Sequence, residues 1–158
     1  MAWKGPLRTA LAVGVAAGVG DVACQAFESR GTDRPWDRNR SIRMIISGGA
    51  VSGPVAHGWN VMLERLLPGK SMTQILKKVV ANGAFAPVQI VLTFSTLSLL
   101  QGHSISHAHE KVKADLPRTW LAGATFWPFV GFLQFRFVPV QHRAIMGSLA
   151  GVLWSVYM

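Results

Sequence analysis

The chain is short of cysteine, of acidic residues and of charge in general. Cys24 is the single cysteine among 158 residues, which excludes an intrachain disulfide and a cysteine-rich metal site. Charged residues make up 15% of the sequence, whereas a soluble domain usually contains about a quarter. The sequence also lacks a long Gly/Ser linker and a low-complexity tract, so we expect a single domain over residues 1–158.

Motifs of the common enzyme classes are missing too. The sequence contains no G-x-S-x-G, no phosphate-binding glycine loop and no H-E-x-x-H. Its nearest approach to a metal site is His103, His107 and His109. Because Glu110 is the only acid near these histidines, we interpret the stretch as a solvated polar loop. We therefore expect no catalytic residue, no metal site and no cofactor.

Long runs without Asp, Glu, Lys or Arg take the place of these features. About 20 predominantly apolar residues span a bilayer core, and residues 44–63 and 79–109 reach that length outright. Residues 119–137 reach it once Arg136 is counted near the end of the run. This pattern predicts membrane-spanning helices and not the core of a soluble domain.

The polar breaks between the runs set the topology. We predict an all-α, polytopic transmembrane helix bundle with four spanning helices and a short C-terminal helix. The helices are expected near residues 7–27, 41–64, 74–101, 118–138 and 143–157. The first resembles a signal peptide, but it continues past any A-x-A-like site, so we interpret it as a retained helix.

The excess of positive charge has two possible explanations. Sixteen Lys and Arg stand against seven Asp and Glu, which gives a net charge of +9. These cations lie between the apolar runs and not along one helix face, and no RNP-like motif or zinc spacing accompanies them. We therefore expect basic loops that face anionic lipid headgroups, and no nucleic-acid partner. The Lys and Arg counts of the two sides are equal, so they leave the orientation in the membrane open.

Ionisable groups inside apolar runs need partners. Helix arithmetic places Asp21 near the start of the second segment, where we expect it to pair with Arg40 or Arg43. Arg136 lies at the opposite depth and is expected to reach the interface or to meet Glu64. The intramembrane polar and charge-pair candidates are Asp21, Gln25, Arg40, Arg43, His57, Glu64 and Arg136.

Small residues recur at spacings that suit helix packing. Three GxxxG spacings occur, and in the first segment Gly14, Gly18 and Asp21 lie on one helix face. In lipid, helices associate through such close approaches, so we expect a packed bundle with the short last helix held by its own glycines. The helix-packing candidates are Gly14, Gly18, Gly49, Gly53, Pro54, Gly147 and Gly151.

Aromatic and basic residues near the ends of the runs are expected at the membrane interface. These anchors are Trp59, Trp127, Arg143, Trp154 and Tyr157. We expect the aromatic edge of Trp154 to face a partner or lipid. His57 lies inside the second segment, where it is expected to be a helix-packing donor or, alternatively, a proton relay.

The motifs follow one another in an order that resembles a known family. They are GDVACQ at 20–25, D-x-x-R-x-x-R at 37–43, GP-x-x-H-x-W at 53–59, FAP at 85–87, WP…F-x-x-VP-x-x-x-R at 127–143 and W-x-x-Y at 154–157. The series is similar to the Mpv-seventeen family, also called the peroxisomal membrane protein twenty-two family, from about residue 3 to residue 157. The resemblance implies a small four-helix-type protein of the mitochondrial inner membrane or, alternatively, of the peroxisomal membrane.

The resemblance also implies a function, namely a channel or permeability modulator for small solutes with no agreed catalytic activity. Several polar residues usual in the family are replaced, among them an Asp-Gln pair for which this chain has Ala81-Asn82. Because a water-filled conduit needs such groups, a structural (accessory) subunit of a respiratory or ATP-synthase membrane complex is the alternative. The expected partners are membrane lipids and, under the alternative, other subunits of that complex.

Overall fold

The computed structural model describes residues 4–30 and 35–157, and every regular element within them is helical. The elements are α1 (Lys4–Glu28), α2 (Arg38–Ile46), the π-helix η1 (Ser47–Ser52), α3 (Gly53–Leu66), α4 (Met72–Leu100), α5 (Ile105–Phe137) and α6 (Val140–Tyr157). Because α2, η1 and α3 follow one another without a break, they form one long rod over residues 38–66. The prediction of an all-α fold is confirmed.

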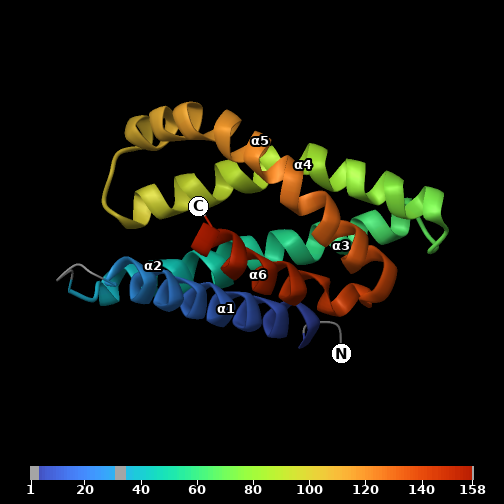
Figure 1. Cartoon of the computed structure of the whole chain (residues 1–158), viewed down its shortest axis with the longest axis horizontal. Coiled ribbons are helices and arrows are strands. Elements are labelled where there is room, and N and C mark those ends of the chain that lie inside the picture. The colour runs from blue at the N-terminus through green and yellow to red at the C-terminus, as the bar shows by residue number, and fades with distance from the viewer. Residues whose placement is uncertain (1–3, 31–34, 158) are drawn as a thin grey trace.

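The helices form two layers (Figure 1). One layer is the antiparallel hairpin of α4 and α5, and the other holds α1 and α6 side by side. The rod of residues 38–66 contacts α1 and α6 and also reaches α4 through η1. It therefore joins the two layers, so a substitution in the rod is expected to affect the packing of both layers.

The connecting segments gather at two ends of the molecule (Figure 1). We call one the α3–α4 end, which holds the start of α1, the loop at 67–71 and the turn at 138–139. We call the other the α1–α2 end, which holds the α1–α2 connection and the loop at 101–104. Glycines with positive φ, Gly69 at 100° and Gly102 at 84°, allow the tight reversals in the two loops.

Local capping explains where three of the helices begin. The side chain of Asp37 accepts from the backbone N–H of Arg40, and Ser71 and Ser104 cap α4 and α5 in the same way. Helix α5 consequently begins at Ile105 and not near 118, so our interpretation of the histidine stretch as a loop is wrong. Pro117 lies inside α5 without ending it, because the cap and an i,i+4 ion pair between Lys111 and Asp115 support the first turns.

The rod contains a π-helical segment that the sequence pattern did not predict. Its sequence, SGGAVS, consists of small residues, and the widened turn brings Gly48 and Gly49 against α1. A Cβ added at Gly48 would lie 2.8 Å from the Cβ of Ala17. The π-helix therefore follows from close packing between backbones, which is a tertiary effect.

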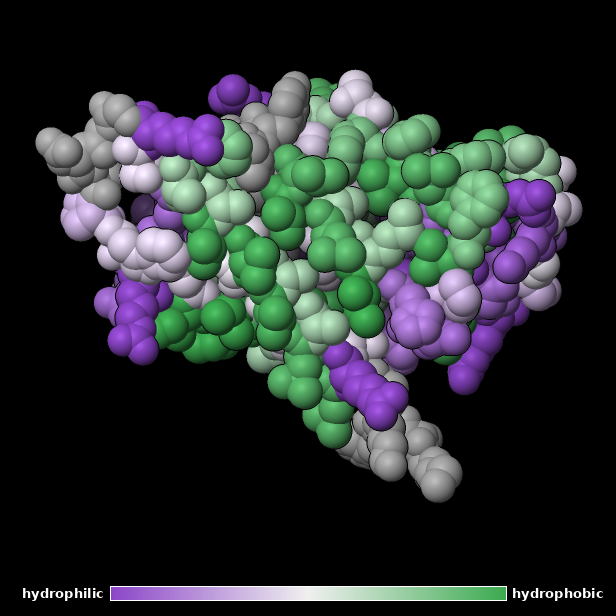
Figure 2. Space-filling model, turned by 60° about the horizontal axis from the view of Figure 1, so that its bottom comes forward, coloured by the Kyte–Doolittle hydropathy of each residue, from purple (hydrophilic) through white to green (hydrophobic). Residues whose placement is uncertain are grey.

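Apolar surface surrounds this bundle. Two helical stretches, Pro6–Glu28 and Met72–Leu100, are long and apolar enough to cross a membrane by length and composition. Figure 2 shows a hydrophobic band across the middle of one face, with hydrophilic residues mostly toward the two ends. The small buried cluster of Leu63, Ile75 and Phe135 lies near the α3–α4 end, where α3, α4 and α5 meet. The interior is thus modest, while much of the apolar surface is exposed.

Candidate functional site

Buried charges gather in two clusters, one at each end of the molecule. The Asp21 cluster, at the α1–α2 end, consists of Asp21, Gln25, Asp37, Arg40 and Ser41. The Glu64 cluster, at the α3–α4 end, consists of Glu64, Lys78 and Arg143.

In the Asp21 cluster, the buried acid has three side-chain partners. Its carboxylate is 1% exposed, and Oδ2 accepts from Gln25 Nε2 and from Ser41 Oγ, both at 2.7 Å. Its other oxygen, Oδ1, forms an ion pair with Arg40 Nε at 2.6 Å. The structure thus pairs Asp21 with Arg40, one of the two partners that its depth predicted.

Gln25 joins α1 to the start of α2. Its Oε1 accepts from the backbone N–H of Asp37 at 2.8 Å, and its Nε2 also lies 3.0 Å from the carbonyl oxygen of Asp37. The side chain therefore satisfies both backbone groups at the N-cap of α2. Together with Asp21 it fixes where the rod begins relative to α1.

The two arginines of this end have different partners. Arg40 also binds Glu28 through both terminal nitrogens, at 2.8 and 3.0 Å. Arg40 therefore binds two carboxylates, because its Nε pairs with Asp21. Arg43 instead contacts Asp37 at 3.3 Å and does not reach Asp21.

In the Glu64 cluster, one carboxylate oxygen serves two cations. Glu64 Oε2 accepts from Lys78 Nζ at 2.8 Å and from Arg143 Nη1 at 2.7 Å. The Lys78 side chain is 0% exposed and that of Arg143 is 1% exposed, whereas Glu64 is 30% exposed. The two cations come from α4 and α6 and the acid from α3, so the cluster ties three helices together.

Backbone oxygens complete the surroundings of the two cations. Lys78 Nζ donates to the carbonyl oxygen of Gly69 at 3.0 Å, and Arg143 Nε donates to that of Val138 at 3.0 Å. The Arg143 guanidinium also lies 5.1 Å from the centre of the Phe135 ring, and its backbone carbonyl accepts from Gln134. These contacts hold both cations in place on the inner side of the bundle.

Two expectations for this end need correction, and one residue was missed. Arg143 is a buried ion-pair partner and not an interfacial anchor, because α6 starts at Val140 and turns its side chain toward α3. Glu64 pairs with Lys78 and Arg143 and not with Arg136, which is exposed and lies near the Phe137 ring. Sequence reasoning missed Lys78, although its position directly before the run at 79–109 was a usable signal.

A line of polar side chains runs between the rod and α4. Ser52 Oγ and Thr93 Oγ1 lie 3.5 Å apart, and the antiparallel register that brings them together places Ser47 opposite Ser98. Further toward the α3–α4 end, the indole N–H of Trp59 donates to Asn82 Oδ1 at 3.0 Å. We call this line the polar seam, and its members are Ser47, Ser52, Trp59, Asn82, Thr93 and Ser98.

Two polar atoms of the seam are buried without a hydrogen-bond partner among the residues that the structure describes. They are Ser47 Oγ and Ser98 Oγ. Such atoms are rare in protein interiors and are commonly satisfied by water. The seam therefore has unused hydrogen-bonding capacity deep inside an apolar bundle.

The remaining polar and aromatic candidates lie between helices. His57 Nδ1 is 3.4 Å from Thr9 Oγ1, so it bridges the rod to α1, as a helix-packing histidine does. Trp59 stacks on Phe85 with ring centres 3.9 Å apart and is not at the interface, because its indole fills the contact between α3 and α4. The aromatic pair Trp127 and Trp154 joins α5 to α6, with ring centres 6.1 Å apart.

Trp154 therefore does not present a free aromatic edge to a partner. Its ring also stacks near Phe126 of α5, with centres 5.5 Å apart, which turns it toward the bundle. The Tyr157 side chain lies outside the described residues. The anchors that the sequence predicted at the membrane interface are, where described, mostly contacts between helices.

Of the predicted helix-packing glycines, those of α1 and of the rod make close contacts between helices. Gly14 and Gly18 on α1 face the rod, where a Cβ on Gly14 would lie 3.2 Å from the Cα of Gly49, and Gly53 lies close to Ala10. Pro54 is exposed in the first turn of α3, so it starts that helix and does not pack.

The glycines of α6 do not make a comparable contact. A Cβ on Gly147 would lie 3.6 Å from Gln134 Nε2, which is an ordinary contact, and one on Gly151 would meet nothing within 4 Å. The close approach between α1 and α6 is made instead by Gly20, where an added Cβ would lie 3.0 Å from Val152. The expectation that Gly147 and Gly151 hold the last helix is therefore wrong.

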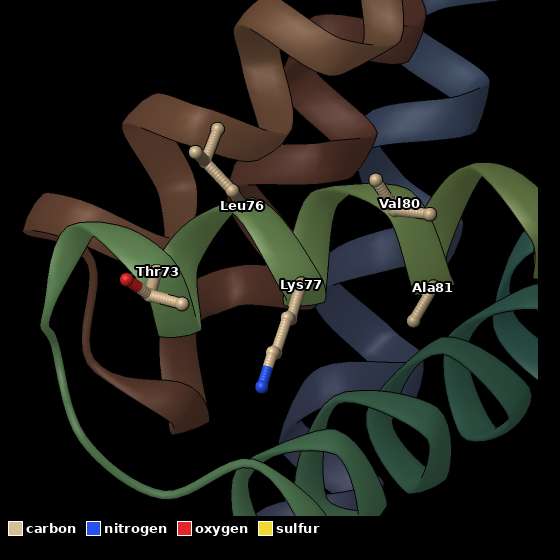
Figure 3. Close-up of a pocket in the computed structure, with 5 residues that line it drawn as sticks. All are labelled: Thr73, Leu76, Lys77, Val80 and Ala81. Atoms are coloured by element: carbon tan, nitrogen blue, oxygen red, sulfur yellow. The ribbon is translucent and has the colours of Figure 1, made fainter.

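Among the hollows on the surface of the described residues, two lie along α4 and between α1 and α6. One, of about 440 Å³, lies along α4 and is lined by Thr73, Leu76, Lys77, Val80 and Ala81. Figure 3 shows that Lys77 and Ala81 point to one side of α4 while Leu76 and Val80 point to the other. The second, of about 530 Å³, is an apolar groove between α1 and α6 with Arg8 at its rim.

The sequence matches proteins of one family. The family described as Mpv17 / PMP22 family matches residues 98–158. The chain is 33% identical to Protein sym-1 of Neurospora crassa, over 97% of the chain and 90% of that protein. It is 31% identical to the mitochondrial inner membrane protein Mpv17 of Xenopus laevis, over 99% and 87%. It is 26% identical to Protein SYM1 of Saccharomyces cerevisiae, over 94% and 79%. No solved structure matches the chain.

Proposed function

The chain belongs to the Mpv17 / PMP22 family of membrane proteins, and from this we propose that it is a non-catalytic protein of the mitochondrial inner membrane that acts as a channel or permeability modulator for small solutes. The names of several relatives give the mitochondrial inner membrane as their location. The peroxisomal membrane is the alternative, because another relative is named a PXMP2/4 family protein.

In this proposal four helical rods cross the membrane. They are α1, the rod of residues 38–66, α4 and the second half of α5, with α6 packed beside α1. At 1.5 Å per residue the rod is roughly 43 Å long, which exceeds the roughly 30 Å of a bilayer core. Both charge clusters then lie near the ends of the rods, where water and headgroups are within reach.

The polar seam is the observation that supports a role in permeation. A polar group without a hydrogen-bond partner in hydrocarbon costs several kcal/mol of folding free energy. A line of such groups along a spanning helix therefore indicates a functional role. Ser47 and Ser98 have polar atoms that water would satisfy. A seam that admits water between the rod and α4 would also admit small polar solutes, in the way that other pores replace bulk hydration.

Flux measurements with matched variants test this function. Proteoliposomes should release small neutral solutes faster than empty liposomes, and Thr93→Val combined with Ser52→Ala should reduce that release. Thr125→Val is the control, because this exposed hydroxyl on α5 donates to the carbonyl of Ala122 in its own helix. Release no faster than from empty liposomes, or an equal loss in the control, would contradict the proposal.

A second function, as an accessory subunit of a respiratory or ATP-synthase complex, rests on a different observation. Helix α4 exposes large apolar side chains along much of its length, among them Leu76, Val80, Val88, Val91 and Leu99. Lipid or another subunit could cover this face equally well on chemical grounds. Native electrophoresis in mild detergent separates the two, since a subunit migrates with a large complex and a separate channel does not.

A further inference from the structure

The Glu64 cluster has more positive than negative charge. Two cations that are 0% and 1% exposed share one carboxylate oxygen, and the structure places no second acid beside them among the residues it describes. A buried charge without a counter-charge is costly. A second negative group at this place would therefore be stabilised strongly.

Both cations also retain donors that Glu64 does not use. A lysine ammonium has three donors and a guanidinium has five. In the described part of the chain, Lys78 donates to Glu64 and Gly69, and Arg143 donates to Glu64 and Val138. The free donors of a lysine and an arginine held side by side suit the several oxygens of a phosphate group.

Glu64 is the partner that can leave. Its side chain is 30% exposed, whereas both cations are buried, and it lies in the last turns of α3 before the loop that contains Gly69. A rotation about its side-chain bonds would carry the carboxylate into solvent without moving a helix. The carboxylate thus occupies a position that an oxygen of an external anion would take.

The surroundings draw anions toward this position. Five further cations with exposed side chains belong to the elements of the α3–α4 end, and they are Arg8, Arg65, Lys70, Lys77 and Arg136. Of the acids that the structure describes, Glu64 alone lies at this end, while five lie at the α1–α2 end. Such a single-sign surface raises the local concentration of anions.

We propose that the Glu64 cluster is a binding site for a phosphate group, which displaces the Glu64 carboxylate and binds between Lys78 and Arg143. The phosphate belongs either to a soluble molecule or to a lipid headgroup, and the chemistry of recognition is the same for both. The site does not depend on solute passage along the polar seam, so either proposal can fail without the other.

Phosphate binding to the full chain in neutral detergent tests the site. Inorganic phosphate should raise the melting temperature relative to chloride at equal ionic strength. Glu64→Gln should raise the apparent phosphate affinity about tenfold or more, because it removes the group that keeps the site occupied for most of the time. Glu28→Gln is the matched control, since it removes one carboxylate that pairs with Arg40 of the other charge cluster.

A second variant keeps the test decisive if Glu64→Gln does not fold. Arg143→Lys keeps the charge but loses the planar fork of donors, so the phosphate-induced shift of the wild type should be lost. Equal phosphate responses in Glu64→Gln and Glu28→Gln, or no response in the wild type and in either lipid arm below, would overturn the site.

Lipid composition identifies the source of the phosphate. The protein is placed in nanodiscs of phosphatidylcholine alone or with phosphatidylglycerol, in phosphate-free buffer, and its melting temperature is measured for the wild type and Arg143→Lys. A stabilisation by phosphatidylglycerol that requires Arg143 assigns a lipid headgroup. A stabilisation only by added inorganic phosphate assigns a soluble ligand.

Discussion

Asp21 and Glu64 are acids of two apolar helices, and their surroundings differ in charge balance. Asp21 has one cation and two neutral donors, and the cation is itself shared with Glu28 at the surface. Glu64 has two buried cations to itself. In the first arrangement two carboxylates share one cation, so it has no surplus of positive charge, and it fixes the α1–α2 connection. The second has a surplus positive charge and leaves room for an anionic ligand.

A double-mutant cycle should measure the coupling between Asp21 and Arg40. Asp21→Asn and Arg40→Gln should each destabilise the protein, and the pair should lose less than the sum by about 1–3 kcal/mol. The measurement is unfolding in detergent followed by circular dichroism. Arg43→Gln is the control for the cycle, because Arg43 contacts Asp37 and not Asp21, so additive losses with Arg40 but not with Arg43 would contradict the pairing.

Removing one charge at a time from the Glu64 cluster should have unequal effects. Lys78→Met keeps the side-chain length and leaves a balanced pair of Glu64 and Arg143, so it should change the free energy of unfolding by about 1 kcal/mol or less. Glu64→Gln leaves two buried cations without a counter-charge and should destabilise by about 3–5 kcal/mol. Unfolding is measured in chloride buffer without phosphate, and equal losses would show that charge balance does not govern this site.

The sequence predicted part of these clusters and not the rest. The depth of Asp21 followed from helix arithmetic alone, because one helix and one short connection determine it. The partners of Glu64 come from residues 14 and 79 positions away, and their meeting depends on how α4 and α6 rotate about their axes. Charge-free runs give the position of a helix along the sequence but not its rotation, so Arg143 was predicted at the interface.

Contacts between whole helices depend on where glycine faces backbone. At Gly14 an added Cβ would lie 3.0 Å from the carbonyl oxygen of Ile45, which cannot move without the rod. At Gly18 the nearest atoms belong to the Ile45 side chain, which is partly exposed and can turn. In the GxxxG spacing of α1, Gly14 therefore cannot accept a larger residue without movement of the rod, whereas Gly18 can accept one if the Ile45 side chain turns.

Alanine substitutions at glycines should rank by these contacts. Gly14→Ala should destabilise by about 1–3 kcal/mol, because it overpacks a contact between backbones. Gly151→Ala should be neutral or stabilise by up to about 1 kcal/mol, since an added Cβ meets nothing within 4 Å and alanine favours the helix. Melting temperatures in one detergent provide the comparison, and a larger loss at Gly151 than at Gly14 would refute the assignment of the contact.

Helix positions were predicted better than helix contacts. The predicted bounds of the first three helical rods agree with the structure to within a few residues, because charged and capping residues mark them in the sequence. The extension of α5 to Ile105 was missed because the polar stretch with the histidines was interpreted as a loop. The π-helix was missed because it arises from contact with α1. The periodicity of the sequence within the rod carries no information about that contact.

Over the whole molecule, the polar seam lies where the rod meets α4, and acidic residues are distributed unequally between the two ends. Lys and Arg are shared equally between the ends, but the acids are not, so only the α3–α4 end has a strong positive surface. A count of Lys and Arg alone hides this difference. The two membrane faces of the proposed bundle therefore differ in their attraction for anions, even though positive charges alone do not distinguish them.

A disulfide across the seam should join the rod to α4. Ser52→Cys with Thr93→Cys should cross-link on oxidation, because the native hydroxyl oxygens lie 3.5 Å apart and Cys24 is buried. Protection from maleimide, measured by mass spectrometry, reports the bond, and reduction should reverse it. If solutes pass along the seam, the oxidised protein should release them more slowly than the reduced protein. Ser52→Cys with Thr125→Cys is the control, and cross-linking in it alone would contradict the register.

Because its three charged residues come from three helices, the Glu64 cluster is completed in a fixed order during synthesis. Glu64 and Lys78 are 14 positions apart and leave the ribosome nearly together, so the growing chain first holds a neutral pair. Arg143 follows 79 positions after Glu64 and arrives with the last helix. The surplus positive charge therefore comes into being only when α6 docks, and a chain that stops short of α6 would not acquire it. Affinity for an anion at this place would mark the finished molecule.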